Sequence, residues 1–340
     1  MLRIGVVGSG FMGRTWAEVS RRHLTGADVV GVTGGRRAAA LADDYDVPRY
    51  DSVEKLLASG TIDVVVLASP PAGHLEQTLL AARHGVHLLV EKPMANSLDE
   101  ARQMVDACDK AGVKLAVVSQ HRFRDAPVAA KRALDGGELG VVRMARAIGP
   151  EVGFWDMTKT MDQWKLDPAQ QGVYASWGAH ACDLLRWFVG DEPDLAFAMF
   201  SNHRGESPVG SNAMVSYRFP EAMSQVWMSY EIPSPGLGSG LQFQLVADRG
   251  ILEVDAYGDV RLGRDGEWST IHRHTPFDAS DPVSKERLRA YAAELQDLLD
   301  AVAEDRPPFV DGVSGAHTVA MLDAAEQSAA AGHAVAVARP

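Results

Sequence analysis

Lys92 stands at a position in the sequence that requires a chemical explanation. The apolar run Leu88–Val90 predicts the end of a buried strand, Glu91 and Lys92 follow it, and Pro93 stops the chain directly afterwards. In a parallel α/β sheet, ligands bind beyond the carboxyl ends of the strands. An ammonium group there can hydrogen-bond a reacting hydroxyl and stabilise charge developing on its oxygen. Lys92 is therefore a candidate catalytic residue, the alternative being a purely structural lysine.

A second candidate site is the glycine-rich segment near the amino end. Gly8, Gly10 and Gly13 form a G-x-G-x-x-G pattern, with Phe11 and Met12 inside it, between a predicted strand and a predicted helix. In this context the glycines provide a tight turn, close approach of the backbone to a pyrophosphate, and close helix–strand packing. The pattern predicts a dinucleotide-binding loop; the alternative is a turn that is merely rich in glycine.

The end of the second predicted strand bears on the choice of cofactor. NAD-binding folds place an acidic residue about 20 residues after the glycine loop. Counting from Gly13 gives Thr33, which is followed by Gly34 and then by Arg36 and Arg37. A 2′-phosphate would meet no carboxylate here and could pair with an arginine. We therefore expect NADP or NAD as cofactor, with NADP favoured, unless both arginines are simply solvated residues at the start of a helix.

A histidine in the second half of the chain suits proton transfer. Ser176, His180 and Asp183 are spaced by four and three residues, so one helical face carries all three if the helix extends back to Ser176. Cys182 points elsewhere and should not share a metal with His180. Because the unperturbed pKa of histidine lies near working pH, His180 is a candidate general acid or base. The alternative is a histidine that caps a helix or fills the core.

Residues 1–121 should form a domain that positions the first two sites. Short apolar runs alternate with helical stretches around Leu75–His84 and Asp99–Ala111, and Gly112 ends the latter. This order predicts a doubly wound parallel sheet of the Rossmann type, covered on both faces. The expected strands are Ile4–Val7, Val29–Val32, Val64–Ala68, His87–Val90 and Leu115–Val118.

Residues 122–340 should form a second, α+β domain for substrate binding and oligomerisation. Its strands lack regular helical crossovers, which predicts a mostly antiparallel open sheet. Helices are expected near 125–135, 178–189, 284–303 and 313–331. The expected strands are Val142–Ile148, Asn212–Phe219, Ser224–Glu231, Gln242–Ala247 and Ile251–Ala256.

Composition excludes several classes of function. Acidic residues outnumber basic residues by 45 to 33, which argues against nucleic acid as a partner. The two cysteines form no disulfide framework or CxxC metal pair, and no metal site is expected. No apolar run reaches the ~20 residues needed to cross a bilayer, and Met1 leads straight into a strand. We therefore expect a cytoplasmic protein without a membrane anchor.

Several segments resemble the Gfo/Idh/MocA family, which includes inositol dehydrogenases and glucose–fructose oxidoreductase. The Glu91-Lys92-Pro93 motif is the most specific element, and the resemblance extends over nearly the whole chain, least over residues 143–162 and 200–240. The segments are "GVVGSGFMG", "ALADDYDVP", "VVVLASPPAGHLEQTLLAARHGVHLLVEKPMA", "WKLDPAQQGVYASWGAHACDLLRWFVG" and "YAAELQDLLDAVAEDRPPFVDGVSGAHTVAMLDAAEQSA".

The resemblance implies an NAD(P)-dependent oxidoreductase. It would move a hydride between nicotinamide and a secondary hydroxyl or ketone of a sugar, cyclitol or related polyhydroxy compound. Lys92 and His180 would be its catalytic residues. The resemblance also implies roles for Asp183 on the substrate side and for His74 and Glu91 on the cofactor side, although His74 could instead lie at the surface. The remaining candidates are Ser176, Tyr174 and Arg122 for the substrate, and Ser69 and Pro70 for the cofactor; Arg122 could instead form a salt bridge at the domain junction.

The sequence departs from the family pattern beside the histidine. Ser176 stands where the family usually has an aspartate, and Gln170-Gln171-Gly172 replaces a longer glycine run. A carboxylate is therefore lost where substrate hydroxyls usually bind. Two other hypotheses stay open at this point: cleavage of a glycoside through transient sugar oxidation, and a cofactor-sensing regulatory protein without catalysis. Because a partly open sheet often buries its free face against another subunit, we expect a homodimer or homotetramer.

Overall fold

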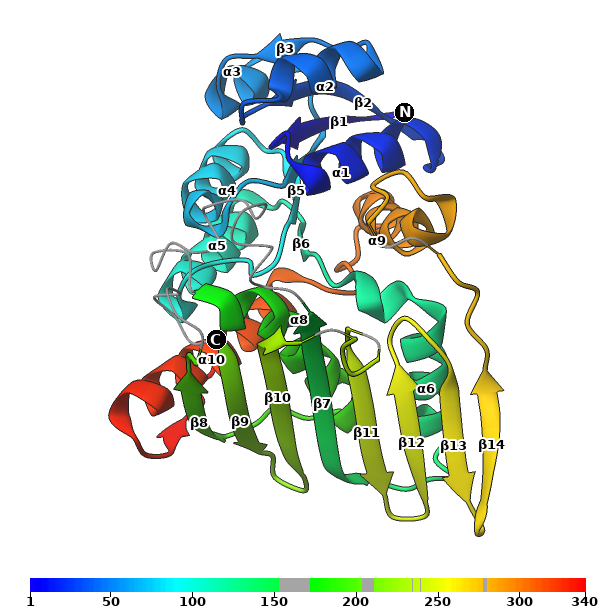
Figure 1. Cartoon of the computed structure of the whole chain (residues 1–340). Coiled ribbons are helices and arrows are strands. Elements are labelled where there is room, and N and C mark those ends of the chain that lie inside the picture. The colour runs from blue at the N-terminus through cyan, green and yellow to red at the C-terminus, as the bar shows by residue number, and fades with distance from the viewer. Residues whose placement is uncertain (153–171, 204–210, 234, 239, 278–279) are drawn as a thin grey trace. The chain divides into compact units, whose positions relative to one another are not determined.

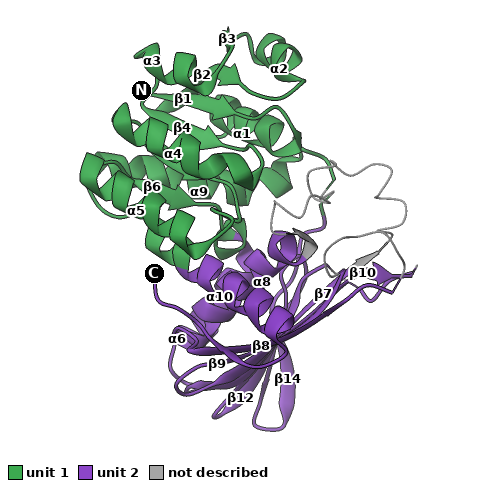
Figure 2. Cartoon of the chain, turned by 90° about the vertical axis from the view of Figure 1, so that its left-hand side faces the viewer, with its two compact units in different colours: residues 1–123, 277–316 green, residues 124–276, 317–340 purple. Residues whose placement is uncertain are grey.

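The structure is a computed structural model that describes residues 1–152, 172–203, 211–233, 235–238, 240–277 and 280–340 (Figure 1). The chain divides into two compact units, which Figure 2 distinguishes by colour. The first unit contains residues 1–123 and 277–316, and the second contains residues 124–276 and 317–340.

The units differ from the expected division at residues 121 and 122. The segment 277–316 belongs to the first unit, although it lies inside the expected second domain. The reason is the helix α9 (Lys285–Ala303), whose buried Leu288, Leu295 and Leu298 join the hydrophobic core of the first unit.

The first unit is built on a six-stranded sheet in the order β3-β2-β1-β4-β5-β6, and all of its pairings are parallel. This confirms the predicted Rossmann sheet; only the two-residue strand β3 was not anticipated. The chain turns to the other half of the sheet between β1 and β4, the place where such sheets bind dinucleotides. The strands are β1 (Leu2–Val7), β2 (Ala27–Thr33), β3 (Arg49–Tyr50), β4 (Val64–Leu67), β5 (His87–Val90) and β6 (Leu115–Val117).

Helices connect these strands, and their ends follow from local sequence. α5 begins where the Ser97 hydroxyl accepts a hydrogen bond from the Glu100 N–H, and it ends at Gly112, whose φ of 67° suits glycine. Besides α9, the helices of this unit are α1 (Phe11–Arg22), α2 (Ala38–Tyr45), α3 (Val53–Ala58), α4 (His74–Arg83), α5 (Leu98–Ala111) and the 3₁₀ turns η1 (Pro71–Gly73) and η2 (Gln120–Phe123).

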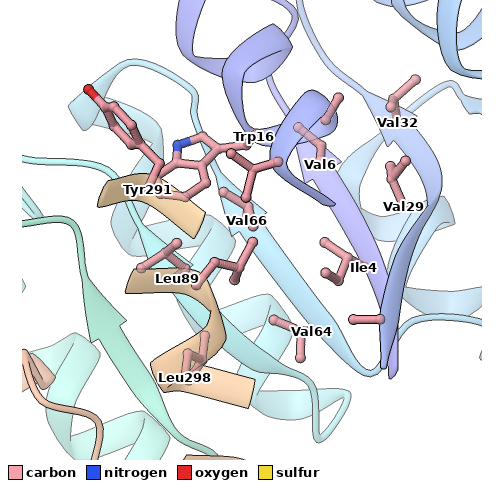
Figure 3. Packing of buried hydrophobic residues seen from close by; sticks show 14 of the residues in the cluster. Ile4, Val6, Trp16, Val29, Val32, Val64, Val66, Leu89, Tyr291 and Leu298 are labelled. Carbon is pink, nitrogen blue, oxygen red and sulfur yellow. The ribbon is translucent and has the colours of Figure 1, made fainter. Parts of the chain in front are cut away.

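The hydrophobic core of the first unit joins sheet, α1 and α9 (Figure 3). Ile4, Val64 and Leu89 lie on the strands and have no exposed surface. The Trp16 ring of α1 meets the Tyr291 ring of α9 edge to face, with centroids 5.3 Å apart. Burying each large side chain contributes about 1.5–3 kcal/mol, so α9 is held to the sheet mainly by apolar packing.

The second unit is built on a nine-stranded sheet in the order β14-β13-β12-β11-β7-β10-β9-β8-β15. β7 and β10 are parallel, and the other pairs are antiparallel, which confirms the predicted mostly antiparallel sheet. The strands are β7 (Val142–Val152), β8 (Leu195–Ser201), β9 (Asn212–Arg218), β10 (Met223–Ile232), β11 (Gln242–Ala247), β12 (Gly250–Asp255), β13 (Val260–Arg264), β14 (Glu267–His272) and β15 (Val335–Ala336).

Helices cover one face of this sheet, and the opposite face carries no helix among the described residues (Figure 1). The covering helices are α6 (Asp125–Asp135), α8 (Gly172–Val189) and α10 (Gly312–Ala331), whose first turn belongs to the first unit. β9 shows the resulting alternation: Val215 and Tyr217 are buried, whereas Met214 and Ser216 are exposed. Within the described part of the chain, no helix combines the length and apolarity needed to cross a membrane.

Candidate active site

Five segments of the first unit follow the carboxyl ends of parallel strands and therefore meet along one edge of the sheet. These are Gly8–Gly13 after β1, 33–37 at the end of β2, 69–74 after β4, 91–92 after β5 and 120–122 after β6. This edge is where open α/β sheets bind their ligands. It gathers every residue of the first unit that the sequence singled out.

The glycine loop has the geometry of a phosphate cradle. Gly8 has a φ of 109°, and a side chain there would approach the Ala68 carbonyl oxygen to 2.4 Å. A side chain at Gly13 would lie 2.1 Å from the Gly8 carbonyl oxygen. At Gly10, by contrast, an added Cβ would meet only the Arg37 Nη2, at 3.8 Å. Gly8 and Gly13 are thus needed for packing, while the backbone at Gly10 is open to a ligand.

The start of α1 suits an anion. Gly10 caps the helix without a side-chain hydrogen bond, and the first turn carries no acidic residue. Phe11 is exposed and Met12 is half-buried, so both lie at the rim of the loop. Free backbone N–H groups and the helix dipole favour a phosphate at such a terminus. The residues present therefore fit the pyrophosphate of a dinucleotide.

The end of β2 corrects one expectation. Thr33 is 1% exposed, and its hydroxyl donates a 2.8 Å hydrogen bond to the Tyr50 carbonyl oxygen. It is therefore part of the β2–β3 packing and does not present its hydroxyl to a phosphate. Gly34 has a φ of 79°, a turn that leads the chain to the exposed Arg36 and Arg37.

Arg37 is connected to the glycine loop. Its backbone N–H donates a 3.1 Å hydrogen bond to the Ser9 hydroxyl, inside the loop. Together with the position of its Nη2 above Gly10, this places Arg37 beside the phosphate cradle. Arg36 has no comparable contact to the loop among those the structure gives.

The Glu91-Lys92-Pro93 motif is held by its buried carboxylate. The Trp16 indole N–H donates a 2.9 Å hydrogen bond to Glu91 Oε1, and the Lys92 backbone N–H donates a 3.2 Å bond to Oε2. Burial raises the pKa of Glu91, although Lys92 and these donors favour its ionised form. Lys92 itself is half-buried and precedes a cis peptide bond to Pro93.

His74 occupies a different position from the one expected. The ring has no exposed surface, so it cannot line a cofactor pocket. Its Nε2 lies 2.9 Å from the Ser69 carbonyl oxygen and its Nδ1 lies 3.2 Å from the Met94 carbonyl oxygen. Burial lowers the pKa of His74. The residue joins the loop after β4, where Ser69 and Pro70 lie, to the loop that carries Lys92.

Arg122 also belongs to the first unit. It lies in η2 after β6, is 8% exposed, and its Nη2 is 3.4 Å from the Ser314 hydroxyl. The side chain of Arg122 is thus mostly buried.

In the second unit, α8 carries the predicted histidine constellation on one helix, as expected. His180 is 8% exposed, and its ring meets the Trp177 ring edge to face, with centroids 5.7 Å apart. Ser176 lies one turn earlier and is half-buried. Asp183 is 6% exposed, and its Oδ1 is 4.0 Å from Arg186 Nη1. The family's altered glycine run at Gln170 and Gln171 lies outside the described residues.

Tyr174 does not fit its expected role in substrate binding. It is 2% exposed, and its hydroxyl lies 3.0 Å from the Tyr217 hydroxyl and 3.7 Å from the Cys182 sulfur. Tyr217 in turn donates a 3.0 Å hydrogen bond to the Met321 carbonyl oxygen. Burial raises the pKa of Tyr174 well above its usual value. The ring is part of the core between α8 and the sheet.

Two residues near the site were missed by sequence reasoning. Trp16 contacts Glu91, and Arg287 of α9 contacts Thr15 in α1. An aromatic residue on an apolar helix face gives no sign of a polar contact, and Arg287 is separated from α1 by about 270 residues of sequence. The described residues contain no group of three or more His, Cys, Asp and Glu side chains that could hold a metal ion.

Comparisons with known proteins agree with this geometry. A model described as an oxidoreductase family with an NAD-binding Rossmann fold matches residues 2–119, and a GFO/IDH/MocA C-terminal domain model matches residues 128–253. The 1,5-anhydro-D-fructose reductase of Ensifer adhaerens is 32% identical over 227 residues, which are 64% of this chain and 66% of that relative.

Two further proteins are similar over most of the chain. D-xylose 1-dehydrogenase (NADP(+)) 2 of Haloferax volcanii is 27% identical over 88% of each chain. The solved structure of levoglucosan dehydrogenase in complex with NADH and levoglucosan has the same fold, with a TM-score of 0.86 and 20% identity over 99% of this chain and 100% of that one. Because models of one family match both halves of the chain and the glycine loop fits a dinucleotide, the protein belongs to the Gfo/Idh/MocA family of NAD(P)-dependent oxidoreductases.

Proposed function

We propose that the protein transfers a hydride between nicotinamide and a secondary hydroxyl or ketone of a sugar, cyclitol or related polyhydroxy compound. The observation that carries the proposal is the position of Lys92. It follows β5 at the ligand-binding edge of the sheet, and Glu91 ties its backbone to α1, the helix that follows the glycine loop. A lysine held beside a dinucleotide loop is well placed to act on the reacting oxygen.

The two candidate catalytic residues have complementary tasks. The bound cofactor supplies a nicotinamide ring that accepts or gives the hydride. Lys92 would hydrogen-bond the substrate oxygen and stabilise the negative charge that develops on it. His180 would take the hydroxyl proton during oxidation and return it during reduction, the usual work of a general acid or base. Lys92 belongs to the first unit and His180 to the second.

Ser176, Asp183 and Arg122 are the candidate residues for substrate recognition. Ser176 and Asp183 lie one turn before and one turn after His180 on α8. Arg122 lies in η2, which follows β6 in the first unit. Arg186 holds Asp183 from one side and donates a 2.6 Å hydrogen bond from its Nε to Glu192. An aspartate constrained in this way can orient substrate or histidine without a large loss of side-chain entropy.

For the cofactor we propose a preference for NADP over NAD. Arg37 is supported as the phosphate-binding residue by its backbone bond to Ser9 and by its guanidinium above Gly10. β2 ends in Thr33 and two glycines, so no carboxylate stands at its end to repel a 2′-phosphate. The Haloferax volcanii relative, whose name specifies NADP(+), is consistent with such a preference.

We further propose that the protein forms a homodimer or homotetramer through the uncovered face of the large sheet. Four methionines on that face are between 46% and 59% exposed. In the strand register Met199 pairs with Met214, and Met223 pairs with Met144, so apolar side chains continue across neighbouring strands. Contiguous exposed apolar patches usually mark interaction surfaces, and a second copy of the same sheet would match this one in shape and hydrophobicity.

The catalytic proposal is tested by mixing the protein with NADPH or NADH, or with their oxidised forms, and a panel of sugars, anhydrosugars and cyclitols. Absorbance change at the nicotinamide band for at least one member, absent in Lys92→Met, is the expected result. Product formation without net cofactor turnover would instead indicate transient oxidation followed by elimination. If no member of a broad panel reacts in either direction while both cofactors bind, the proposed substrate class is wrong.

The proposed assembly has its own test. Light scattering should give at least twice the chain mass for the wild type, and Met199→Lys with Met214→Lys should shift the protein to the monomer. The control is Gln327→Lys, which adds a charge at an exposed position of α10, on the face of the sheet that the helices cover. It should leave the assembly unchanged. A wild type that is monomeric at micromolar concentration would contradict the proposal.

A further inference from the structure

Arg287 is a buried cation next to the cofactor loop. It lies in the first turn of α9 and is 3% exposed. Its guanidinium carbon is 4.6 Å from the centre of the Phe11 ring on one side and 4.7 Å from the centre of the Tyr291 ring on the other. Phe11 is the first residue of α1 and belongs to the glycine loop. The start of α9, about 270 residues further along the chain, thus packs against the glycine loop through Arg287 and Phe11.

The hydrogen bonds of Arg287 go to neutral atoms. Its Nη1 donates to the Thr15 hydroxyl at 3.0 Å and to the Pro282 carbonyl oxygen at 3.4 Å. Its Nη2 is 3.5 Å from the Tyr291 hydroxyl and 3.8 Å from the Met12 sulfur. Among the residues that the structure describes, no carboxylate forms an ion pair with Arg287.

A comparison within the chain shows that this arrangement is unusual. Arg186 in the second unit is 6% exposed and is paired with Glu192 and Asp183. A guanidinium does not release its proton in proteins, and a buried charge is costly unless an opposite charge or polar groups compensate it. Aromatic faces and neutral acceptors compensate the charge of Arg287 only in part, so an anion bound nearby would stabilise it.

Glu91 is a buried carboxylate whose pKa responds to the charge of Arg287. Burial has the largest effect and raises the pKa of Glu91. The charge of Arg287 lowers this pKa, but less than Lys92 and Trp16 do. Glu91 is also committed to Trp16 and to the Lys92 backbone. It therefore does not serve as the direct partner of Arg287.

We propose that Arg287 is a positioning residue of the cofactor site whose charge is balanced by the dinucleotide pyrophosphate. It would fix the first turn of α1 through Phe11, Met12 and Thr15, and place a permanent positive charge behind the N–H groups that bind the phosphates. The proposal rests on the cofactor binding of the family and adds to it a residue outside the Rossmann segment. Anions at a helix N-terminus gain from added positive charge nearby.

The same residue connects the loop to the lysine motif. Arg287 stacks on Tyr291, the Tyr291 ring meets the Trp16 ring, and Trp16 donates to Glu91. A change in the first turn of α9 can therefore reach both the phosphate loop and Lys92.

The experiment compares Arg287→Met, which removes the charge, with Arg287→Lys, which keeps it. The matched control is Arg289→Met on the exposed side of the same helix, with the same change in net charge. Affinities for ADP-ribose, which contains the pyrophosphate, and for adenosine, which lacks it, are measured by calorimetry at several salt concentrations, together with Tm.

For ADP-ribose we expect Arg287→Met to weaken binding by about tenfold and to flatten its salt dependence, because a positive charge behind the phosphate-binding N–H groups is removed. Adenosine binding should change by less than about twofold. Arg287→Lys should recover at least half of the loss on a logarithmic scale, and Arg289→Met should behave like the wild type.

Two results would overturn the proposal. Equal loss of ADP-ribose affinity in Arg287→Lys and Arg287→Met, with the salt dependence unchanged, would mean that only packing is at work. Unaltered affinity in Arg287→Met, with only a lower Tm, would have the same meaning. Should Arg287→Met fail to fold, Arg287→Lys and Phe11→Leu, which removes the stacked ring, provide the same comparison. Failure of the wild type to bind ADP-ribose would instead contradict cofactor binding itself.

Discussion

The Trp16 indole N–H donates a 2.9 Å hydrogen bond to the Glu91 carboxylate, and both side chains are buried. Trp16 lies on the helix that follows the glycine loop, and Glu91 immediately precedes Lys92. Because the other carboxylate oxygen accepts the Lys92 backbone N–H, one acidic group fixes the lysine relative to the cofactor loop. The glutamate of the motif is therefore a structural partner of the lysine, and its own contact with a cofactor remains a prediction.

We predict that Trp16→Phe lowers stability by about 1–3 kcal/mol, since a buried acceptor then lacks a donor. It should also reduce kcat more than cofactor affinity, because the Lys92 backbone loses a constraint. Urea unfolding and steady-state kinetics would measure both effects. Trp187→Phe, which removes an indole from the second unit, is the control; if it reduces kcat equally, the link through Glu91 is not responsible.

Lys92→Ala should abolish turnover while cofactor affinity changes little. The expected loss corresponds to roughly 3 kcal/mol of transition-state stabilisation, or about a hundredfold or more in kcat. Single-turnover hydride transfer with saturating cofactor measures it directly. A variant that retains more than about a tenth of the wild-type kcat would be incompatible with a catalytic lysine.

For His180→Ala we expect kcat to fall by about 10²- to 10⁴-fold, the usual contribution of a positioned acid or base. The pH–rate profile should also lose its inflection near neutrality. Trp177→Phe keeps an aromatic ring beside position 180 and serves as a control for packing on α8. If the profile of His180→Ala matches that of the wild type, another group carries the proton, and buried Tyr174 is a poor candidate for that role.

Glu326 on α10 should make stability depend on pH. Burial, assisted by Asp323, raises its pKa from 4.5 to about 7. Between pH 4.5 and 7 the folded protein therefore holds a proton that the unfolded chain has released. This contribution to stability is complete below about pH 4.5 and is lost as the pH rises through 7.

The corresponding variant is Glu326→Gln, which stays neutral at every pH. Its free energy of unfolding should fall less between pH 5 and pH 8 than that of the wild type, by about 1–2 kcal/mol after allowing for partial exposure. Denaturant titrations across this range measure the difference. Asp323→Asn should reduce the effect, and parallel pH profiles for Glu326→Gln and the wild type would contradict the prediction.

The sequence predicted a helix or strand well where a continuous apolar run or a pair of helix caps marks it. Strands β1, β4 and β5 are continuous apolar runs covered on both faces, and α5 has both a serine cap and a C-terminal glycine. The later strands β8, β13 and β14 were missed for two reasons. β8 is apolar on both faces, with Phe197 and Met199 exposed, so its sequence shows no alternation of apolar and polar residues. β13 and β14 mix charged and polar residues with few buried apolar ones. Periodicity is weak where neither face is fully apolar.

The candidate site was only partly predictable, because a motif gives residue types and not the state of each side chain. His74 and Thr33 were expected to face a cofactor, yet their polar side-chain atoms lie within hydrogen-bond distance of backbone carbonyl oxygens of neighbouring segments. Tyr174 was expected beside substrate, yet it pairs with Tyr217 from a distant strand. Such pairings depend on long-range packing, which spacing along the chain does not encode.

The final prediction concerns the choice between NADP and NAD. Thr33 donates its hydroxyl to Tyr50, so the 2′-phosphate would depend on Arg37, Arg36 and the glycine backbone. A charge-assisted bond to phosphate contributes roughly 1.5–3 kcal/mol. The wild type should therefore bind NADPH at least about tenfold more tightly than NADH.

Of the two arginines, Arg37 should matter more, since its backbone is bonded to Ser9 and its Nη2 lies above Gly10. Arg37→Ala should weaken NADPH by about 10- to 100-fold and leave NADH within about twofold, whereas Arg36→Ala should have a smaller effect. Thr33→Val is a matched control that removes a hydroxyl already committed to Tyr50. Equal affinities for NADPH and NADH in the wild type, or unchanged NADPH affinity in both arginine variants, would show that the segment after β2 does not bind the 2′-phosphate.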